Sequence, residues 1–482
     1  GGGAGLVAAC RAKELGSDVI LLEKMDRVGG DTALSSQTAQ GFWTGHTEEA
    51  DTVECYKEDL LASHWATEKG QLGIELPAET PLTDAWLANC DDMYNWTQDL
   101  GMDWQGHVTP SKAWYPQPQW DRYDARAWVP GSGSIISVMQ KTVDNLGVDL
   151  KTGTAAISLI VDETGRVIGL YALEDETPVS IKTNKGVLLA CGGFNANRAM
   201  MAKYLPIQGT GFCGGSNGNT GDGQVMVAAI GGKLVDMDLS THWMVYDSAA
   251  DTTFYLAACS AYGGNNETHP ESSDYPFILV NYDGERYGAE TMGYKYVGHY
   301  TSSQPYHMGY MVFDSGEVCN AWFNTCLAAF GLDEVGSGAG YGDLSKMRIA
   351  EGETLEDLAR MIQVDADALK ATVERYNGFV DGGVDEDFGR SMRNVSRLET
   401  GPFRAIRMQP RHYTTYGGVA IDADGHVLDT NDQPIPGLYA AGTVCGSVVE
   451  QEGIYYQGGV GISMVQGFYM AKNLHEEGAT EA

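Results

Sequence analysis

The sequence predicts an α/β protein in which both ends of the chain build one domain and the middle forms a second, inserted domain. The first observation is a glycine-rich start that runs into an apolar helical stretch and then a strand. The second is a return to short strands and glycine turns near the C-terminus. The third is the middle of the chain, which is richer in Tyr, Gly and Asn. We therefore expect a first domain made of residues 1–238 and 412–482, with residues 239–411 inserted as the second.

Composition excludes several classes of function. The 482 residues carry 31 Lys+Arg against 65 Asp+Glu, a formal net charge of −34, so a nucleic-acid partner is not expected. No run of about 18 apolar residues is present, so no transmembrane segment is predicted. The nine cysteines form neither CxxC nor CxxCH, which indicates reduced thiols, no metal site and no attached haem.

The first forty residues carry the clearest motif. Residues 1–9 open a helix that runs to Leu15, and residues 18–23 form a strand that ends in Glu23. Glycines at such a turn let backbone N–H groups approach a pyrophosphate, and the acid accepts hydrogen bonds from a ribose hydroxyl. We therefore predict a dinucleotide site. The strand that normally precedes this motif falls before residue 1, so we expect the natural N-terminus, with any export signal, to be missing.

The other elements follow from hydrophobic patterns and turn residues. Helices are expected at 47–71, 84–100, 133–145, 224–230, 318–331, 354–379 and 461–474. Strands are expected at 155–161, 167–173, 181–183, 187–191, 420–422, 426–428 and 437–440. The tryptophan-rich and proline-rich stretch 104–133 is predicted to be a packed surface loop.

Seven motifs occur in an order and spacing that resembles one family, the FAD-dependent fumarate reductase / 3-ketosteroid dehydrogenase superfamily of flavoproteins. They are Gly2-Gly3-Ala4-Gly5 with Glu23, Gly29-Gly30, residues 190–194, 220–223, 278–286 leading to Glu290, 416–418 and 437–442. The resemblance covers essentially the whole chain. It implies a Rossmann-like FAD-binding domain built from both termini, and an α+β capping domain that closes over the flavin with the substrate between them.

The resemblance also implies which residues contact FAD. The flavin needs a dry slot with N–H dipoles at its N1/O2 edge, which Gly459 and Gly461 at the start of the last helix would supply. No His or Cys stands directly beside the early glycine segment, so binding is expected to be non-covalent, with His46 as the residue near enough to be an exception. The expected contacts are Gly2, Gly3, Ala4, Gly5, Glu23, Lys24, Gly29, Gly30, Asp31, Thr32, Ser36, Ala155, Ala190, Gly192, Gly193, Asp222, Gly442, Thr443, Gly459, Gly461 and Ile462.

Departures from the dicarboxylate reductases of the family predict the substrate class. Those enzymes carry a proton-donating arginine in the cap, a histidine pair before the late Gly-Gly and an arginine before the last helix. This chain has Tyr294, residues 413–416 (Tyr-Thr-Thr-Tyr) and Tyr455-Tyr456 at the matching places, so the fork that suits a carboxylate is missing. His242 is the one remnant of such a clamp.

Tyrosines are the groups that the ketosteroid-type members use, and the chain is predicted to be closer to them. By resemblance Tyr294 exchanges a proton at the carbon next to a ketone, with Tyr296 as the next candidate. Tyr455 or Tyr456 polarises the ketone oxygen. The expected reaction moves a hydride between flavin N5 and an activated C=C or C–C bond of an enone or ketosteroid-like substrate, in the reductase direction.

Two alternatives remain open. One is a reductase of unsaturated carboxylates, of fumarate or urocanate type, with a variant clamp drawn from Arg122, Arg126, His242 and Arg411. The other is a flavin electron-transfer subunit without substrate chemistry. The electrons are expected from an external donor, because neither a haem motif nor a second dinucleotide motif is present. The sequence predicts no cellular location.

Overall fold

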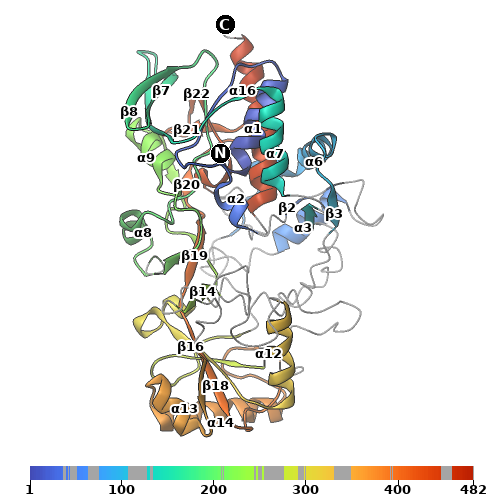
Figure 1. Ribbon diagram of the computed structural model, residues 1–482, viewed down its shortest axis with the longest axis vertical. Helices are drawn as coiled ribbons and strands as arrows, with labels where there is room; N and C mark the ends of the chain where they lie inside the picture. Colours follow the sequence, from blue (N-terminus) through green and yellow to red (C-terminus); the bar gives the residue numbers. More distant parts are fainter. Residues whose placement is uncertain are drawn as a thin grey trace.

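The computed structural model shows an elongated molecule with two lobes, and both chain ends lie in one of them (Figure 1). The structure describes residues 1–35, 39–41, 43, 52–62, 75–106, 127–130, 134–207, 209, 211–243, 246–247, 252–253, 276–290, 298, 300–329, 349–390, 392, 395–446 and 459–480. Among them no helix has the length and apolar character needed to cross a bilayer. The seven cysteines whose side chains the structure describes are free thiols.

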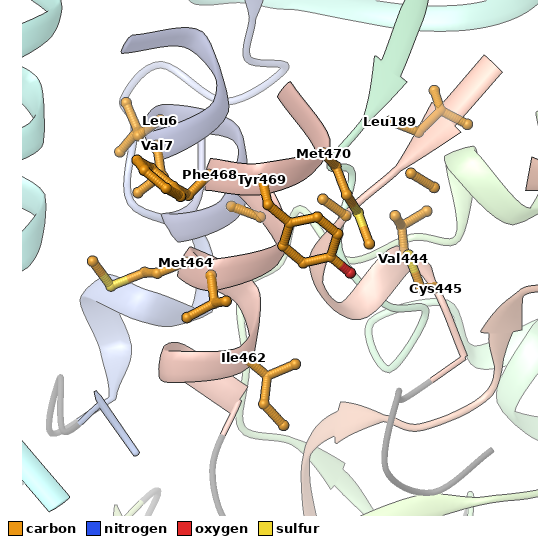
Figure 2. Packing of buried hydrophobic residues seen from close by; sticks show 14 of the residues in the cluster. Leu6, Val7, Leu189, Val444, Cys445, Ile462, Met464, Phe468, Tyr469 and Met470 are labelled. Carbon is orange, nitrogen blue, oxygen red and sulfur yellow. The ribbon is translucent and has the colours of Figure 1, made fainter. Parts of the chain in front are cut away.

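The first lobe is built around helices from opposite ends of the chain. The helix α16 (Gly459–Thr480) packs along α1 (Gly3–Glu14), and α7 (Ile135–Leu146) also packs against α1. Figure 2 shows Leu6 and Val7 of α1 in one buried core with Phe468 of α16. The two ends of the chain therefore share a core.

Two parallel strand pairs accompany these helices. The strand β1 (Ile20–Leu22) pairs with β5 (Asp149–Lys151), and β9 (Val187–Leu189) pairs with β22 (Pro434–Ala440). Strand β21 (His426–Leu428) lies antiparallel to β22. The predicted strand 420–422 is wrong, because Ile421 makes only an isolated bridge to Val427. The remaining small elements are α2 (Gly30–Leu34), α8 (Arg198–Tyr204), α9 (Asp222–Ala229) and η8 (Gly442–Val444).

A β-meander extends from this lobe, as predicted. It consists of β6 (Thr154–Val161), β7 (Val167–Glu174) and β8 (Thr177–Lys182), all antiparallel. Strand β8 begins four residues before the predicted start. Helix α7 begins at Ile135, because Ser134 and Ser137 cap its N-terminus reciprocally. The last helix continues past the predicted end at Leu474, since His475 near its end contacts Ser17 and Lys185.

Two predictions for residues 47–133 need correction. The expected helix 84–100 is two helices, α5 (Pro81–Ala88) and α6 (Cys90–Asp99), because Asn89 leaves helical geometry at φ −107° and ψ 1°. The stretch 104–133 is not simply a loop, since its described ends are strands that pair in one sheet. This sheet has the order β2 (Ala39–Gln40), β4 (Ala127–Pro130), β3 (Trp104–Gly106). Helix α3 (Val53–Ala62) is the described part of the predicted helix 47–71.

The second lobe has its own sheet and its own buried core. Its strands lie in the order β15 (Ile278–Val280), β16 (Gly309–Phe313), β18 (Phe403–Met408), β17 (Ile349–Gly352), all antiparallel. The helices are α12 (Glu317–Ala329), α13 (Leu355–Ile362) and α14 (Ala366–Gly382), with a short η6 (Pro305–His307). The predicted helix 354–379 breaks in two at Gln363, which has a left-handed φ of 60°.

Strands also connect the lobes. Strand β12 (Ser240–Trp243) leads into the middle of the chain and lies antiparallel to β19 (Arg411–Thr415), which leads out of it. On its other side β19 pairs with β10 (Phe212–Cys213), and nearby β11 (Leu234–Val235) pairs with β20 (Gly418–Val419). A further short pair is β13 (Tyr246–Asp247) with β14 (Thr252–Thr253). The predicted domain limits fall at these connecting strands and stay predictions.

Candidate functional site

The glycine-rich start forms the centre of the candidate site. Gly2 stands before α1 in an extended conformation, φ −84° and ψ −172°, and has no side chain that could cap the helix. Apart from the Gly3 N–H, which donates to Thr32 Oγ1, the first-turn N–H groups and the positive end of the helix dipole therefore point toward a possible anion. Gly29 donates its backbone N–H to the carbonyl of Gly1 at 2.7 Å, so the second glycine pair lies directly against the first.

The glycines of α1 serve different purposes. A Cβ atom on Gly3 would lie 2.7 Å from Thr32 Oγ1, which accepts a hydrogen bond from Gly3 N at 3.2 Å. On Gly5 it would lie 3.3 Å from the Cβ of Ala190, at the end of β9. On Gly2 the nearest protein atoms would be 3.9 Å away. A side chain on Gly3 would thus clash with Thr32 and one on Gly5 would be tight against Ala190, whereas Gly2 leaves room beside the backbone, where we predict the pyrophosphate.

Glu23 lies beside this turn. Its Oε2 atom is 3.1 Å from the backbone nitrogen of Gly1, and Oε1 accepts a hydrogen bond from Met25 N at 2.8 Å. The carbonyl of Glu23 accepts a hydrogen bond from Thr154 N at 2.9 Å, which brings the neighbouring Ala155 to the same edge. The acid predicted to bind a ribose is therefore next to the glycine turn.

Lys24 and Asp222, both predicted to contact the cofactor, form an ion pair. Lys24 Nζ lies 2.6 Å from Asp222 Oδ2, in the first turn of α9, and also contacts Thr220 Oγ1. Thr220 in turn donates to the other oxygen of Asp222 at 2.7 Å. The pair is partly exposed, and it fastens the residues after β1 to the start of α9.

The carboxylate of Asp31 is bound by two groups of the protein, one from Ser216 and one from Asn219. Oδ1 accepts from Ser216 N and Oδ2 from Asn219 Nδ2, both at 2.6 Å. Burial raises the pKa of the Asp31 carboxyl above its ordinary value, although these hydrogen bonds act in the opposite direction. Asn219 also donates to Asn195, at 3.1 Å. Sequence analysis passed over both asparagines, although each stands next to a glycine motif.

The strand ends complete the first-lobe part of the site. Gly192, after β9, has a φ of 79° and leaves no room for a side chain beside Asn219, and Gly193 leaves none beside Thr415. Gly442, after β22, has a φ of 77°, and a Cβ atom there would lie 2.9 Å from that of Ala4. Thr443 follows in η8. Gly459 and Gly461 lie in the first turn of α16, followed by the buried Ile462.

Most of the predicted catalytic residues lie outside the described residues. These are Tyr294, Tyr296, Tyr455 and Tyr456, together with Ser36 of the predicted cofactor contacts and Arg122 and Arg126 of the alternative clamp. His242 is described by its backbone in β12, where its partner in register is His412 of β19. His412 is buried, and sequence analysis missed it although it directly follows Arg411.

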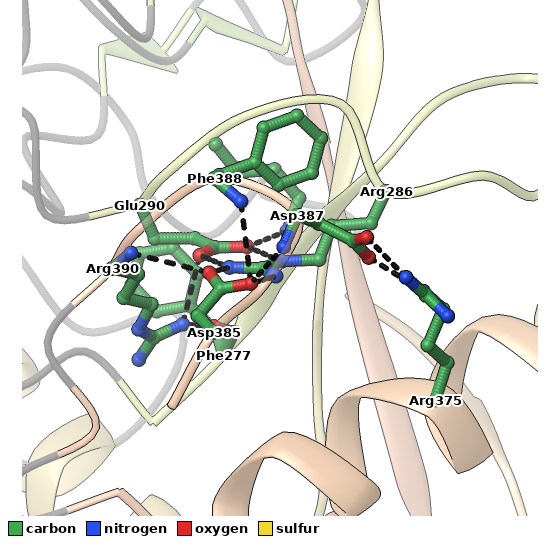
Figure 3. A network of polar contacts seen from close by, with 9 residues as sticks. Phe277, Arg286, Glu290, Arg375, Asp385, Asp387, Phe388 and Arg390 are labelled. Carbon is green, nitrogen blue, oxygen red and sulfur yellow. Dashed lines mark hydrogen bonds and ion pairs between the residues drawn. The ribbon is translucent and has the colours of Figure 1, made fainter. Parts of the chain in front are cut away.

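Glu290, four residues before Tyr294 in the sequence, belongs to a buried network of four charges (Figure 3). Arg286 binds both oxygens of Glu290, at 2.9 and 2.7 Å, and both oxygens of Asp385, at 2.9 and 2.8 Å. Arg390 Nη1 donates to Glu290 Oε2 at 2.9 Å and to the carbonyl of Phe277 at 2.8 Å. Burial acts to raise the pKa of the Glu290 carboxyl, but Arg390 and Arg286 outweigh it and hold this pKa below its ordinary value.

Comparison with known proteins agrees with this geometry. A family model described as FAD binding domain matches residues 1–462. NADH:fumarate oxidoreductase of Klebsiella pneumoniae is 29% identical, over 93% of this chain and 44% of that protein, so the chain spans less than half of that relative. 3-Oxosteroid 1-dehydrogenase of Mycolicibacterium smegmatis is 26% identical, over 98% of this chain and 95% of that protein.

A solved structure, the open conformation of a flavocytochrome c3 fumarate reductase, is 25% identical. It has a TM-score of 0.73, with 99% of this chain and 77% of that chain covered. The predicted α/β fold, FAD cofactor and oxidoreductase class are confirmed at this level. The predicted closeness to the tyrosine-using branch stays a prediction, since the two relatives are similarly distant. The chain thus belongs to the FAD binding domain family, and a fumarate oxidoreductase and a 3-oxosteroid dehydrogenase are among its relatives.

Proposed function

We propose that this chain reduces the C=C bond of an enone or ketosteroid-like substrate, with Tyr294 as the proton donor. The proposal rests on the residues that this chain has at the three positions where the dicarboxylate reductases carry arginine or histidine. Tyr294, residues 413–416 and Tyr455-Tyr456 supply phenols and hydroxyls where a dicarboxylate enzyme needs cations. Phenols donate single hydrogen bonds to a carbonyl oxygen and lack the bidentate fork that a carboxylate prefers.

The proposed roles follow from the chemistry of phenol. FAD, when bound, supplies hydride transfer through its N5 atom. Tyr455 or Tyr456 donates a hydrogen bond to the substrate carbonyl, which makes the β carbon electrophilic. Tyr294 then gives its proton to the α carbon. With an unperturbed pKa of about 10, tyrosine is a poor base at neutral pH but a competent acid toward a developing carbanion.

Two further observations support this assignment. Glu290 fixes the backbone four residues before Tyr294 through its three hydrogen bonds to arginine nitrogens and one to Leu279 N. The similarity to 3-oxosteroid 1-dehydrogenase extends over 98% of this chain, which is consistent with a ketone-bearing substrate. Electrons are proposed to come from an external protein or small carrier.

A second candidate, reduction of an unsaturated carboxylate, is favoured by one specific arrangement. In the β12–β19 ladder His242 lies opposite His412, and Trp243 lies opposite Arg411. Two histidines and an arginine therefore occupy adjacent register positions on the strands that connect the lobes. Because successive residues of a strand face opposite sides of the sheet, Arg411 and His412 cannot both face one ligand, so the variant carboxylate clamp would use either the histidine pair or Arg411, joined by other arginines.

A substrate panel distinguishes the two candidates. The holoprotein is reduced anaerobically, mixed in a stopped-flow instrument with enones, steroid enones, acrylates and fumarate-like acids, and followed by the return of oxidised-flavin absorbance. Fast re-oxidation by enones supports the proposal, and fast re-oxidation by the acids alone supports the carboxylate alternative. Re-oxidation by no organic acceptor, but by a protein partner, would identify an electron-transfer subunit and refute both.

A further inference from the structure

We propose that two buried glutamines, Gln224 and Gln466, are positioning residues that hold the turn Gly442–Val444 in the shape that binds FAD. Gln466 Oε1 on α16 accepts a hydrogen bond from Gly442 N at 2.9 Å. Gln224 Nε2 on α9 donates to the carbonyl of Val444 at 3.3 Å. The turn is therefore held at its first and last residue by side chains from two different helices.

Gln224 also reaches the opposite strand end. The same Nε2 atom donates to the carbonyl of Gly192 at 3.2 Å. Since Gly192 follows β9 and the turn follows β22, this one amide links the carboxyl ends of two neighbouring parallel strands. Both ends are predicted FAD segments, and ligands in open α/β sheets bind at such strand ends.

The turn also touches the helix that receives the pyrophosphate. Gly442 has no space for a side chain beside Ala4, in the first turn of α1. Gly467, the residue after Gln466, is likewise pressed against the backbone of Ala4. A displacement of the turn would therefore disturb both Thr443 and the start of α1.

Stability alone is a poor reason for these amides to be buried. Gln224 and Gln466 are 0% and 1% exposed. Gln224 Oε1 and Gln466 Nε2 have no hydrogen-bond partner among the described residues. A buried polar atom without a partner costs free energy, whereas an apolar side chain of the same size would not carry that cost. What the two amides contribute is thus the set of hydrogen bonds that they make to the turn and to Gly192.

The chemistry of the partners makes the two sites respond differently to substitution. Gly442 N–H can only donate, so residue 466 must present an acceptor. The Gly192 and Val444 carbonyls can only accept, so residue 224 must present a donor. An ionised glutamate keeps an acceptor and loses the amide donor, whereas methionine has the right length and loses both; because burial favours the protonated acid, the glutamate variants are compared at a pH well above the ordinary pKa of glutamate.

The test measures FAD affinity of the apoprotein by fluorescence titration, together with the melting temperature of the apoprotein. We expect Gln466→Met, which loses one buried hydrogen bond, and Gln224→Met, which loses two, each to weaken FAD binding about tenfold or more. Gln466→Glu should stay within about threefold of the wild type, and Gln224→Glu should be as weak as Gln224→Met. The control is Asn377→Leu, which removes a buried amide bonded to both backbone groups of Leu398 in the second lobe.

If the two glutamines only stabilised the fold, their variants would lose melting temperature without losing FAD affinity. Asn377→Leu should lower the melting temperature and leave FAD affinity unchanged. If both methionine variants do the same, or if Gln466→Glu binds FAD as weakly as Gln466→Met, the inference is overturned. Should the methionine apoproteins fail to fold, FAD release on dilution of the two glutamate holoproteins decides. Faster release from Gln224→Glu supports the inference, and equal release contradicts it.

Discussion

Gly2 and Gly30 lie so close together that a Cβ atom on Gly30 would come within 3.3 Å of the Gly2 Cα atom. Gly30 has a φ of 51°, in the left-handed region that favours glycine. The contact brings the turn after β1 against the turn before α1. It leaves one side of Gly2 free, and this is the surface that we predict a pyrophosphate approaches.

The first prediction uses the room around Gly2. Its conformation suits any residue, and among the described residues an added Cβ atom would meet no atom closer than 3.9 Å. We therefore expect Gly2→Ala to leave the melting temperature of the apoprotein unchanged. FAD affinity should fall by about tenfold or more, because the methyl group occupies the approach of the pyrophosphate, at a cost of about 1.4 kcal/mol.

Gly378→Ala is the matched control. Gly378 lies in α14, has nothing within 4 Å of an added Cβ atom, and is far from the glycine turn in the sequence. Its substitution should raise stability by roughly 0.5–1 kcal/mol through helix propensity and leave FAD binding unchanged. Wild-type FAD affinity in Gly2→Ala would show that the motif is misplaced.

The second prediction concerns the four buried charges of the second lobe. Asp385→Asn leaves part of the Arg286 charge without its counterion in a buried site. Removing one partner of such a pair typically costs about 3–5 kcal/mol. Urea unfolding of the holoprotein should show a loss of this size, with FAD affinity kept.

Asp387→Asn is the comparison for this network. Asp387 pairs with Arg375 at the surface, where both side chains are much more exposed than those of Arg286 and Asp385. Water and salt screen such a pair, so its loss should change the unfolding midpoint far less. Equal losses in the two variants would show that the buried network contributes no more than a surface contact.

The sequence predicted those parts of the fold in which neighbouring residues alone determine the backbone conformation. The glycine turns at residues 2–5 and 29–30 and the meander of β6 and β7 were predictable, because glycine and alternating apolar residues report directly on local conformation. The splits at Asn89 and Gln363 were not, since glutamine is a good helix former and a single asparagine within a helical pattern does not by itself specify a break.

The polar contacts of the site were harder to predict for a different reason. Asn195 meets Asn219, and Gln466 meets Gly442, only after distant segments pack together. Nothing local marks such residues as different from surface amides. The pairing of His242 with His412 likewise depends on the register of two strands about 170 residues apart in the chain, which no local pattern specifies.

The third prediction is a pH dependence of stability at the end of α16. His426 Nδ1 lies 2.8 Å from Asp422 Oδ2, and its Nε2 atom lies 2.9 Å from Glu477 Oε2. The hydrogen bond to Asp422, with that to Glu477, raises the pKa of His426 to about 9. Because the folded pKa lies above the unfolded one, the stabilisation is complete below about pH 6.5 and is lost as pH rises through 9.

Melting temperatures between about pH 6 and pH 10 test this directly. The wild type should lose stability across that window, and His426→Gln should lose much less, because the neutral amide does not titrate. Asp424 also lies in this cluster, where the side-chain oxygens of Asp422 and Asp424 and a His426 ring nitrogen come within 4.8 Å of one another. The melts are therefore repeated with chelator. Identical pH profiles for both proteins would contradict the assignment.

The central claim is that Tyr294 gives the proton to the substrate, and Tyr294→Phe tests it most directly. The measurement is anaerobic single-turnover re-oxidation of the reduced holoprotein by the best enone of the substrate panel. Loss of general acid catalysis should slow this step by about 10²–10⁴-fold, roughly 3–5 kcal/mol at the transition state. FAD binding and reduction by an artificial donor should be unchanged.

Two further variants serve as comparisons for Tyr294→Phe. Tyr456→Phe should slow re-oxidation by less, about 10–10²-fold, if it only polarises the carbonyl. Tyr296→Phe, two residues from Tyr294, should re-oxidise at nearly the wild-type rate. Melting temperatures of all three show whether lost stability contributes. The account predicts the largest loss in Tyr294→Phe, and a Tyr294→Phe protein that is re-oxidised at the wild-type rate would contradict it.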